Sequence, residues 1–161
     1  MLVSLRPIDP KDLGVVAQIL LDKTIRKTYM VPDLTHDAAM ALAGRFAALS
    51  QDESRYVRGI YVESALVGLL NDTEISGNSL ELGWVIHPQH HNRGYATAAV
   101  KTAICDLFQK GFRKITAGAF EDNIASQRVM EKAGMVLQEQ TESIEYRGRI
   151  HRCIFYAVEN S

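Results

Sequence analysis

The sequence predicts a mixed α/β fold in which a mostly antiparallel central sheet carries helices on both faces. Three observations lead to this prediction. The chain has 161 residues, which suits a single domain over residues 1–161. Its first half contains alternating apolar runs separated by short turns, the pattern of an antiparallel meander. Its second half alternates between helical and extended patterns, which places helices against the sheet.

The first elements are a strand and two helices. Residues 2–8 alternate and predict a strand. Asp9 and Pro10 then open a helix, because Asp9 can cap the first turn and a proline there loses no hydrogen bond. An irregular polar segment, residues 24–34, leads to a second helix that begins after a capping Thr35.

The meander follows. We expect strands over residues 56–63, 66–70 and 80–87. A tight turn at Ser64-Ala65 joins the first two strands, and residues 71–79 are expected to form a longer turn region.

The second half begins with the strongest helical pattern in the chain. Its buried stripe runs through residues 94–110, and Gly111 marks its end. The remaining elements are a strand at 114–119, a helix at 124–133 capped by Asp122 or Asn123 and ended by Gly134, and strands at 135–138 and 149–158.

Composition and charge exclude several classes of protein. The 18 basic and 19 acidic residues nearly cancel, so the chain has no bulk field for nucleic acid. No apolar run is long enough to span a bilayer, and the first residues lack a secretory pattern. Cys105 and Cys153 lie far apart and are interpreted as small apolar residues in a reducing compartment. We therefore expect a cytoplasmic protein that binds neither membranes nor nucleic acid.

The segment most informative about chemistry is the loop between the strand at 80–87 and the helix that starts near Gly94. Backbone N–H groups at a helix start lack intrahelical partners and carry partial positive charge. Gly94 lets a ligand approach the backbone, small Ala96 leaves the first turn open, and Arg93 adds a fixed charge. Together they predict a pyrophosphate site, although the loop is neither a Walker A sequence nor a three-glycine dinucleotide motif.

Two nearby features are given structural interpretations. His87, His90 and His91 crowd one turn, but no acidic or cysteine ligand is adjacent, so we expect a polar turn and no metal site. Trp84 lies among strand apolar residues and is expected in the core.

The same segment resembles a known family. Residues 81–88 with 91–97 are similar to the acetyl-CoA-binding motif of the GNAT N-acetyltransferases, Gln/Arg-x-x-Gly-x-Gly/Ala, whose last two places are Gly94 and Ala96 here. Residues 123–126 and 132–135 resemble the family's second conserved block. Residues 25–30 and 147–149 resemble the branch that acetylates ribosomal-protein amino termini.

The resemblance implies a sheet of six to seven strands flanked by about four helices, with two parallel strands splayed apart to admit acetyl-CoA. It implies acetyl transfer to a primary amine, on a small molecule or a peptide N-terminus, by direct attack in a ternary complex without a metal. A monomer or a homodimer is compatible with it. The cofactor-binding residues that it implies are Val85, Ile86, His87, His91, Asn92, Arg93, Gly94, Tyr95, Ala96, Thr97 and Asn123.

Catalytic roles are assigned to Glu81 and Ser126. The acceptor amine is protonated near neutral pH, so a base helps, and Glu81 shares a strand face with Gly83. Many family members carry a tyrosine that protonates the departing sulfur, but Met130 stands in its place here. Ser126 or solvent is therefore expected to protonate the sulfur. A second departure is His91 in place of Gln or Arg.

Two questions stay open at the level of sequence. The alternative to an enzyme is a CoA-binding regulatory module of the same fold with a decayed catalytic site. Acceptor specificity is expected in residues 24–34, the second helix and residues 140–149, with Tyr29 and Tyr146 as candidate groove residues. The carboxylates there that would attract a cationic amine are Glu139, Glu142 and Glu145.

Overall fold

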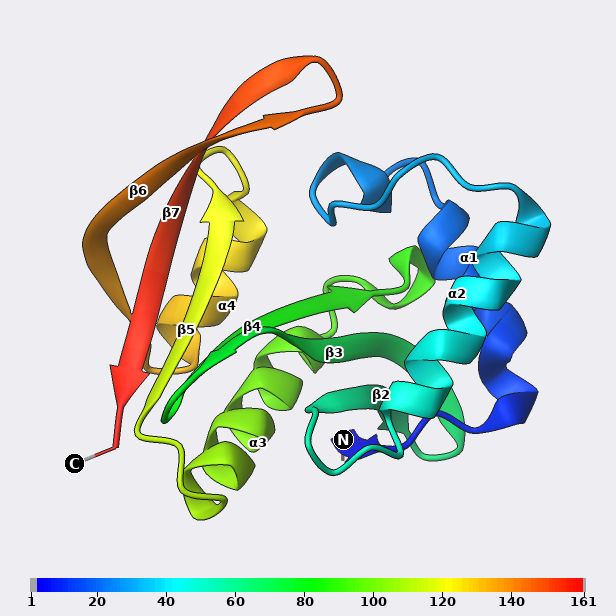
Figure 1. Ribbon diagram of the computed structural model, residues 1–161, viewed down its shortest axis with the longest axis horizontal. Coiled ribbons are helices and arrows are strands. Elements are labelled where there is room, and N and C mark those ends of the chain that lie inside the picture. The colour runs from blue at the N-terminus through cyan, green and yellow to red at the C-terminus, as the bar shows by residue number, and fades with distance from the viewer. Residues whose placement is uncertain (1–2, 161) are drawn as a thin grey trace.

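The computed structural model describes residues 3–160, so Leu2 of the expected first strand lies outside the described residues, as do Met1 and Ser161 (Figure 1). The strands are β1 (Val3–Arg6), β2 (Val57–Val62), β3 (Ala65–Ser76), β4 (Ser79–Ile86), β5 (Lys114–Phe120), β6 (Val136–Tyr146) and β7 (Arg149–Glu159). The α-helices are α1 (Leu13–Leu21), α2 (His36–Leu49), α3 (Tyr95–Gln109) and α4 (Ile124–Lys132).

The helix starts form where capping residues place them. The Thr35 hydroxyl accepts the Ala38 N–H at 3.1 Å and begins α2. The Asp9 carboxylate accepts the Lys11 N–H at 2.9 Å, but it starts a short 3₁₀ turn, Pro10–Asp12, ahead of α1. The predicted first helix therefore begins a few residues later than its cap indicates.

The strands form one sheet in the order β1-β2-β3-β4-β5-β7-β6 within residues 3–160. All neighbouring strands are antiparallel except β4 and β5, which run parallel. Their pairing covers only Ser79–Leu82 of β4, against residues 114–117 of β5. Beyond that point the two strands separate and the sheet opens like a V (Figure 1). The predicted mixed sheet with a splayed parallel pair is confirmed.

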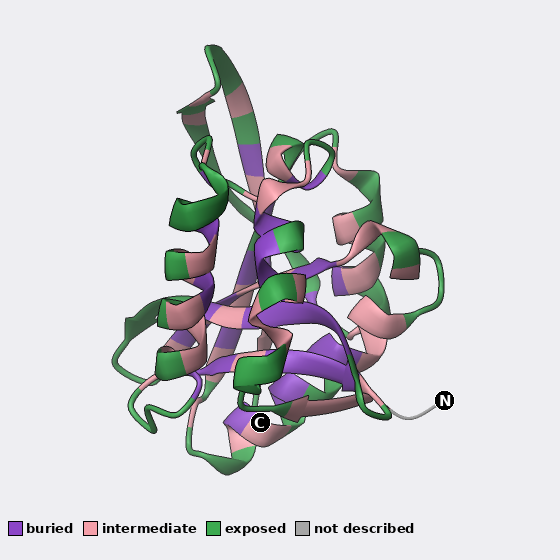
Figure 2. Cartoon of the chain, turned by 90° about the vertical axis from the view of Figure 1, so that its right-hand side faces the viewer, coloured by how far each residue is buried: buried purple, intermediate pink, exposed green. Residues whose placement is uncertain are grey.

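Each face of the sheet packs on a separate apolar core. Alternation along the strands sorts the side chains, so that Leu70 joins the core under α3 and α4 while Leu69 joins the core under α1 and α2. Figure 2 shows buried residues concentrated in the central strands and exposed residues at the β6–β7 hairpin. The α1–α2 pair packs on the β1–β4 half of the V, while α3 contacts β1 and β4 and α4 contacts β5 on the other face.

Two strands are longer than the sequence predicts. The expected turn region at 71–79 shrinks to Gly77-Asn78, because β3 continues to Ser76 in register with β4. The strand expected at 135–138 continues to Tyr146 and pairs with β7. Both extensions are rich in polar residues that backbone pairing holds in strands against their weak β propensity.

None of the helices formed by residues 3–160 combines the length and the apolar character that crossing a membrane requires.

Two glycine-to-alanine substitutions are expected to have opposite effects on stability. At Gly68 a Cβ would lie 2.3 Å from the Val85 carbonyl oxygen, a backbone atom in the adjacent strand. We expect Gly68→Ala to lower the free energy of unfolding by about 3 kcal/mol. Gly44 lies within α2, and an added methyl group there would meet open space, so Gly44→Ala should raise that free energy by about 0.5–1 kcal/mol. Urea unfolding of both variants measures the contrast, and equal effects would contradict it.

Candidate active site

A continuous cleft of about 1460 Å³ occupies the opening between β4 and β5. One end is lined by the start of α3 and by α4, and the other by the loop after α1 and by β6. The floor is formed by β4, β5 and β7. The cleft is larger than a typical small-ligand pocket, so it has room for two reactants side by side.

The α3 end of the cleft is built to bind an anion. Gly94 adopts φ 78°, a left-handed conformation that suits glycine, and it has no side chain to cap the helix. The first intrahelical bond runs from the Ala98 N–H to the Gly94 carbonyl, 3.1 Å, so the N–H groups of residues 95–97 have no partner within the helix. Residues 90–97 all line the cleft. Arg128 and Lys132 add positive charge from α4.

The backbone of β4 presents only alternate residues to the opening. The His87 N–H donates to the Val67 carbonyl on β3, 2.8 Å, and the His87 carbonyl accepts the His90 N–H, 2.8 Å. Both polar backbone groups of His87 therefore have partners within the protein, and its N–H is not free to pair with the cofactor as the sequence analysis expected. By alternation the backbone of Val85 also faces β3, while Trp84 and Ile86 face the opening. Trp84 packs against the apolar core, as the sequence predicted, and it also lines the cleft, a second role that strand alternation could have identified.

His91 closes the turn that leads to the anion site. Its Nε2 lies 2.7 Å from the Ile86 carbonyl oxygen, so this nitrogen carries the proton. The ring thereby holds the loop against the end of β4, while the residue itself lines the cleft.

The other histidines contact one another at the same turn. His90 lies edge-on to His87, with ring centroids 5.9 Å apart, and 6.3 Å from the Tyr95 ring. Burial lowers the pKa of His90, and the charges of His87 and Arg93 lower it further. Within residues 3–160, no three His, Cys, Asp or Glu side chains are grouped as a metal site requires.

Asn123 and Ser126 form a pair where α4 meets the cleft. Asn123 caps the helix, since its Oδ1 accepts the Ser126 N–H at 3.2 Å. Its Nδ2 donates to the Ser126 hydroxyl oxygen at 3.1 Å, which leaves the hydroxyl proton free to donate elsewhere. Both residues line the cleft. Met130 is fully buried in the core under α4, so that position presents no group to the cleft.

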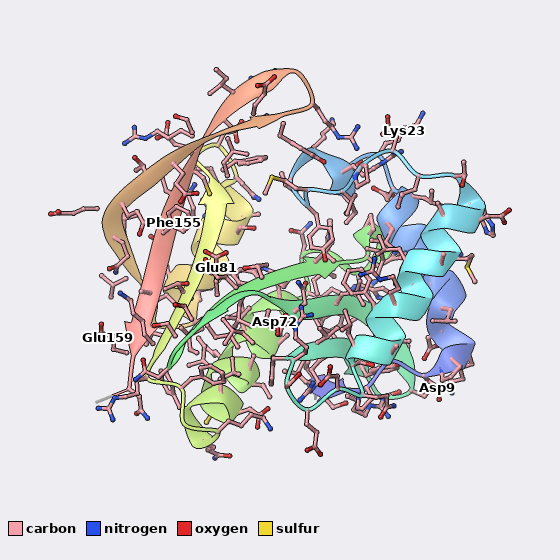
Figure 3. The ribbon with its side chains drawn as sticks, viewed as in Figure 1. Asp9, Lys23, Asp72, Glu81, Phe155 and Glu159 are labelled. Carbon is pink, nitrogen blue, oxygen red and sulfur yellow. The ribbon has the colours of Figure 1, made fainter. Side chains whose placement is uncertain are left out.

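Glu81 lies on the floor where β4 and β5 begin to separate, and Phe155 lines the same opening from β7 (Figure 3). A Glu81 carboxylate oxygen accepts the Thr73 hydroxyl at 2.5 Å. Thr73 also flanks Gly83, where a Cβ would lie 3.1 Å from the Thr73 methyl carbon, so glycine leaves Thr73 room to reach Glu81. Thr73 was placed in a turn at the level of sequence, which is why this partner was missed.

Tyr29 and Asn71 line the same cleft as Glu81. The Tyr29 hydroxyl donates to the Asn71 Oδ1 at 3.2 Å, and Asn71 pairs with Gly83 in the sheet. Burial raises the pKa of Tyr29 to about 12, so its hydroxyl stays protonated and acts as a donor.

Charge is segregated along the cleft. The basic residues at the α3–α4 end are Arg93, Arg128 and Lys132. The acidic residues that line the remainder are Glu74, Glu81, Glu139 and Glu142, and the basic residues Lys27 and Lys114 line it as well, whereas Glu145 is exposed on β6. Acidic side chains therefore outnumber basic ones beyond the α3–α4 end, which favours an anionic ligand at the first end and a cationic one beyond it.

The pKa of the Cys153 thiol responds to the charges of this acidic surface. Burial raises the pKa of its thiol to about 11, and the charges of Glu81 and Glu142 contribute to the rise. Because only the thiolate alkylates, we expect iodoacetamide to label exposed Cys105 first and Cys153 at a rate that climbs until pH approaches 11. Glu81→Gln or Glu142→Gln should speed Cys153 labelling at pH 8, whereas Glu74→Gln serves as the matched control. Mass spectrometry of labelled peptides measures these rates, and equal rates in all variants would contradict the geometry.

Comparison with known proteins agrees with this architecture. Residues 3–136 match the family model described as acetyltransferase (GNAT) domain. The chain is 26% identical over 133 residues to YnaD, an uncharacterized N-acetyltransferase of Bacillus subtilis (strain 168), and the match covers 81% of this chain and 77% of that protein.

Solved structures share the fold over nearly the whole chain. An acetyltransferase of the GNAT family from Bacillus anthracis is 23% identical with a TM-score of 0.84, covering 98% of this chain and 94% of that one. RimL, a ribosomal L7/L12 alpha-N-protein acetyltransferase in complex with coenzyme A, is 17% identical with a TM-score of 0.85, covering 98% and 93%. At these identities the likeness establishes the fold.

Proposed function

The chain belongs to the GNAT acetyltransferase family, and from that premise we propose that it transfers an acetyl group from acetyl-CoA to a primary amine by direct attack in a ternary complex. The observation that carries this proposal is the single cleft that joins an anion-binding helix start to an acidic surface. The match over residues 3–136, with a sheet that continues through β7, supports one N-acetyltransferase domain.

In this proposal acetyl-CoA occupies the basic end of the cleft. Its pyrophosphate lies against the N–H groups that follow Gly94, close to Arg93. Its pantetheine arm extends into the opening and pairs with the backbone of Trp84 and the N–H of Ile86, since the Ile86 carbonyl is bonded to His91, with Asn123 on the opposite side. An N–H of β4 then donates to the thioester oxygen as charge develops there.

The acceptor amine approaches from the acidic end. Glu81, held by Thr73, takes the proton that the amine loses, directly or through a water molecule. The neutral nitrogen attacks the thioester carbon. The tetrahedral intermediate then loses the second nitrogen proton to solvent and releases the sulfur as a thiolate, which leaves a neutral amide. The Ser126 hydroxyl, oriented by Asn123, donates a hydrogen bond to that sulfur, and the proton comes through Ser126 or from solvent.

The acidic surface implies that the acceptor carries a positive charge, and it implies nothing more specific about the acceptor. A small amine or a peptide N-terminus meets that requirement. The second option has the support of the shared fold with RimL, whose name gives a ribosomal protein as its substrate. The resemblance of residues 25–30 and 147–149 to that branch is consistent with it.

Steady-state kinetics with a panel of amines and amino-terminal peptides tests the proposal. We expect release of free thiol from acetyl-CoA to depend on the amine, with intersecting lines in double-reciprocal plots. Parallel lines together with an acetylated protein would contradict direct attack and indicate a covalent intermediate.

A further inference from the structure

Five residues join the two halves of the V across the acceptor end of the cleft. We call them the acceptor clasp: Arg26, Val31, Asp33, Tyr146 and Arg147. The first three lie in the loop after α1, and the last two lie at the tip of the β6–β7 hairpin, about 115 positions further along the chain. Figure 1 shows the hairpin tip reaching over toward this loop.

The clasp is made of directed hydrogen bonds. The Tyr146 hydroxyl donates to the Arg26 carbonyl and accepts the Val31 N–H at 3.3 Å. The Arg147 guanidinium donates to the Val31 carbonyl at 2.8 Å and to the Asp33 carboxylate at 2.8 Å. Its Nε also donates to the Tyr146 oxygen at 3.0 Å, which ties the two hairpin residues together.

The hydrogen bonds to the Val31 backbone contribute more to holding the loop against the hairpin than the ion pairs of Asp33 do. The Asp33 side chain is 78% exposed, so its pairs with Arg26 and Arg147 contribute little to stability. Val31, in contrast, is buried, and both of its polar backbone groups bond to the hairpin. A buried N–H that loses its partner is costly, so the loop follows the hairpin.

The hairpin tip is itself well anchored. Arg147 and Gly148 both have positive φ, 52° and 76°, as a two-residue hairpin turn requires. The Tyr146 ring lies 6.1 Å from the Phe120 ring and 6.2 Å from the His151 ring, and those two rings stack at 4.2 Å. Tyr146 therefore extends from the C-terminal half of the fold as a fixed support.

We propose that Tyr146 and Arg147 are positioning residues that hold the loop of residues 24–34 over the cleft and thereby place the Tyr29 hydroxyl beside Glu81 for the acceptor. The proposal rests on the proposed acetyl transfer. Tyr29 lies between the clasp residues Arg26 and Val31 and reaches Asn71 in the cleft wall. Release of the clasp frees this donor from its place, so acceptor binding weakens while the acetyl-CoA site at α3 stays intact.

Tyr146→Phe tests the positioning role, with Tyr156→Phe as the matched control. The first change removes only the hydroxyl that joins the halves, and the second removes the hydroxyl of a buried tyrosine that contacts Glu131 at 3.5 Å. We expect Tyr146→Phe to raise the acceptor KM about tenfold with the KM for acetyl-CoA and kcat within about twofold. Tyr156→Phe should leave the acceptor KM unchanged. Arg147→Ala should reproduce the effect, and Arg147→Lys should restore part of it.

Hydrogen exchange separates this proposal from the proposed function. We expect the Val31 amide to exchange at least about tenfold faster in Tyr146→Phe than in the unchanged protein. Unchanged exchange in both Tyr146→Phe and Arg147→Ala would overturn the clasp whether or not the protein is active. Faster exchange with an unchanged acceptor KM would overturn positioning and leave the acetyl transfer standing. An unchanged protein that acetylates no amine would overturn the proposed function and, with it, this proposal.

Discussion

Replacement of Glu81 by glutamine is expected to lower kcat by about 100-fold, with acetyl-CoA affinity within about twofold of the unchanged protein. Glutamine has the same shape and still accepts the Thr73 hydroxyl through its amide oxygen, so the cleft keeps its form. It cannot take a proton from the acceptor amine. Steady-state kinetics gives kcat, and titration calorimetry gives the affinity for acetyl-CoA.

Glu74→Gln is the matched control for this substitution. Glu74 pairs with Glu81 across β3 and β4 and lines the same cleft, so the change in net charge is identical.

Because a base is needed only while the amine is protonated, the loss of activity in Glu81→Gln should depend on pH. The defect of Glu81→Gln should shrink as pH rises toward the amine pKa, about 10 for a small amine or about 8 for an amino terminus. Equal losses in both variants, or a defect that does not change with pH, would exclude Glu81 as the base.

Placement of a carboxylate in the anion site is expected to weaken acetyl-CoA binding by about 100-fold, because like charges brought together cost several kcal/mol. Gly94→Asp makes this change at a residue with φ 78°. Gly94→Asn introduces a neutral side chain of nearly the same shape as aspartate. Both asparagine and aspartate tolerate the left-handed conformation. The difference between the two variants therefore isolates charge from backbone strain.

The salt dependence of binding supplies the control for Gly94→Asp. Repulsion between the new carboxylate and the pyrophosphate is screened by salt, so the gap between the Asp and Asn variants should narrow at high ionic strength. Titration calorimetry at two salt concentrations measures it. Equal affinities for the two variants would place the pyrophosphate away from the start of α3.

Local signals in the sequence predicted most of the helices and their ends. Thr35 and Asn123 cap helices, and Gly111 and Gly134 take positive φ just past the ends of α3 and α4. These signals work because a cap or a left-handed glycine depends on only a few neighbouring residues. The pyrophosphate site at Gly94 could be proposed for the same reason.

The strands that line the cleft were predicted least well. Residues 71–76 have a polar composition that is typical of a turn, yet they form the end of β3. Their side chains are polar because some line the cleft and because buried Asp72 pairs with Arg55 at 2.6 Å. Functional surfaces break the alternation of apolar and polar residues from which strands are predicted.

Contacts between distant segments were beyond sequence reasoning. Tyr29 and Tyr146 were both suspected of lining the acceptor groove, but only Tyr29 does so, while Tyr146 holds the loop that carries it. The backbone of His87 was assigned to the cofactor because three consecutive residues were treated alike. Strand geometry sends alternate residues to opposite neighbours, and His87 bonds to β3.

The most direct test of the proposed acetyl transfer counts both products of one reaction. Free thiol and acetylated amine are measured together, by a thiol reagent and by mass spectrometry, with each member of the amine panel and without amine. We predict equal amounts of the two products with the preferred amine and almost no thiol without it. Tight binding of acetyl-CoA with no amine-dependent thiol release from any acceptor would contradict the account and indicate a CoA-binding regulatory module.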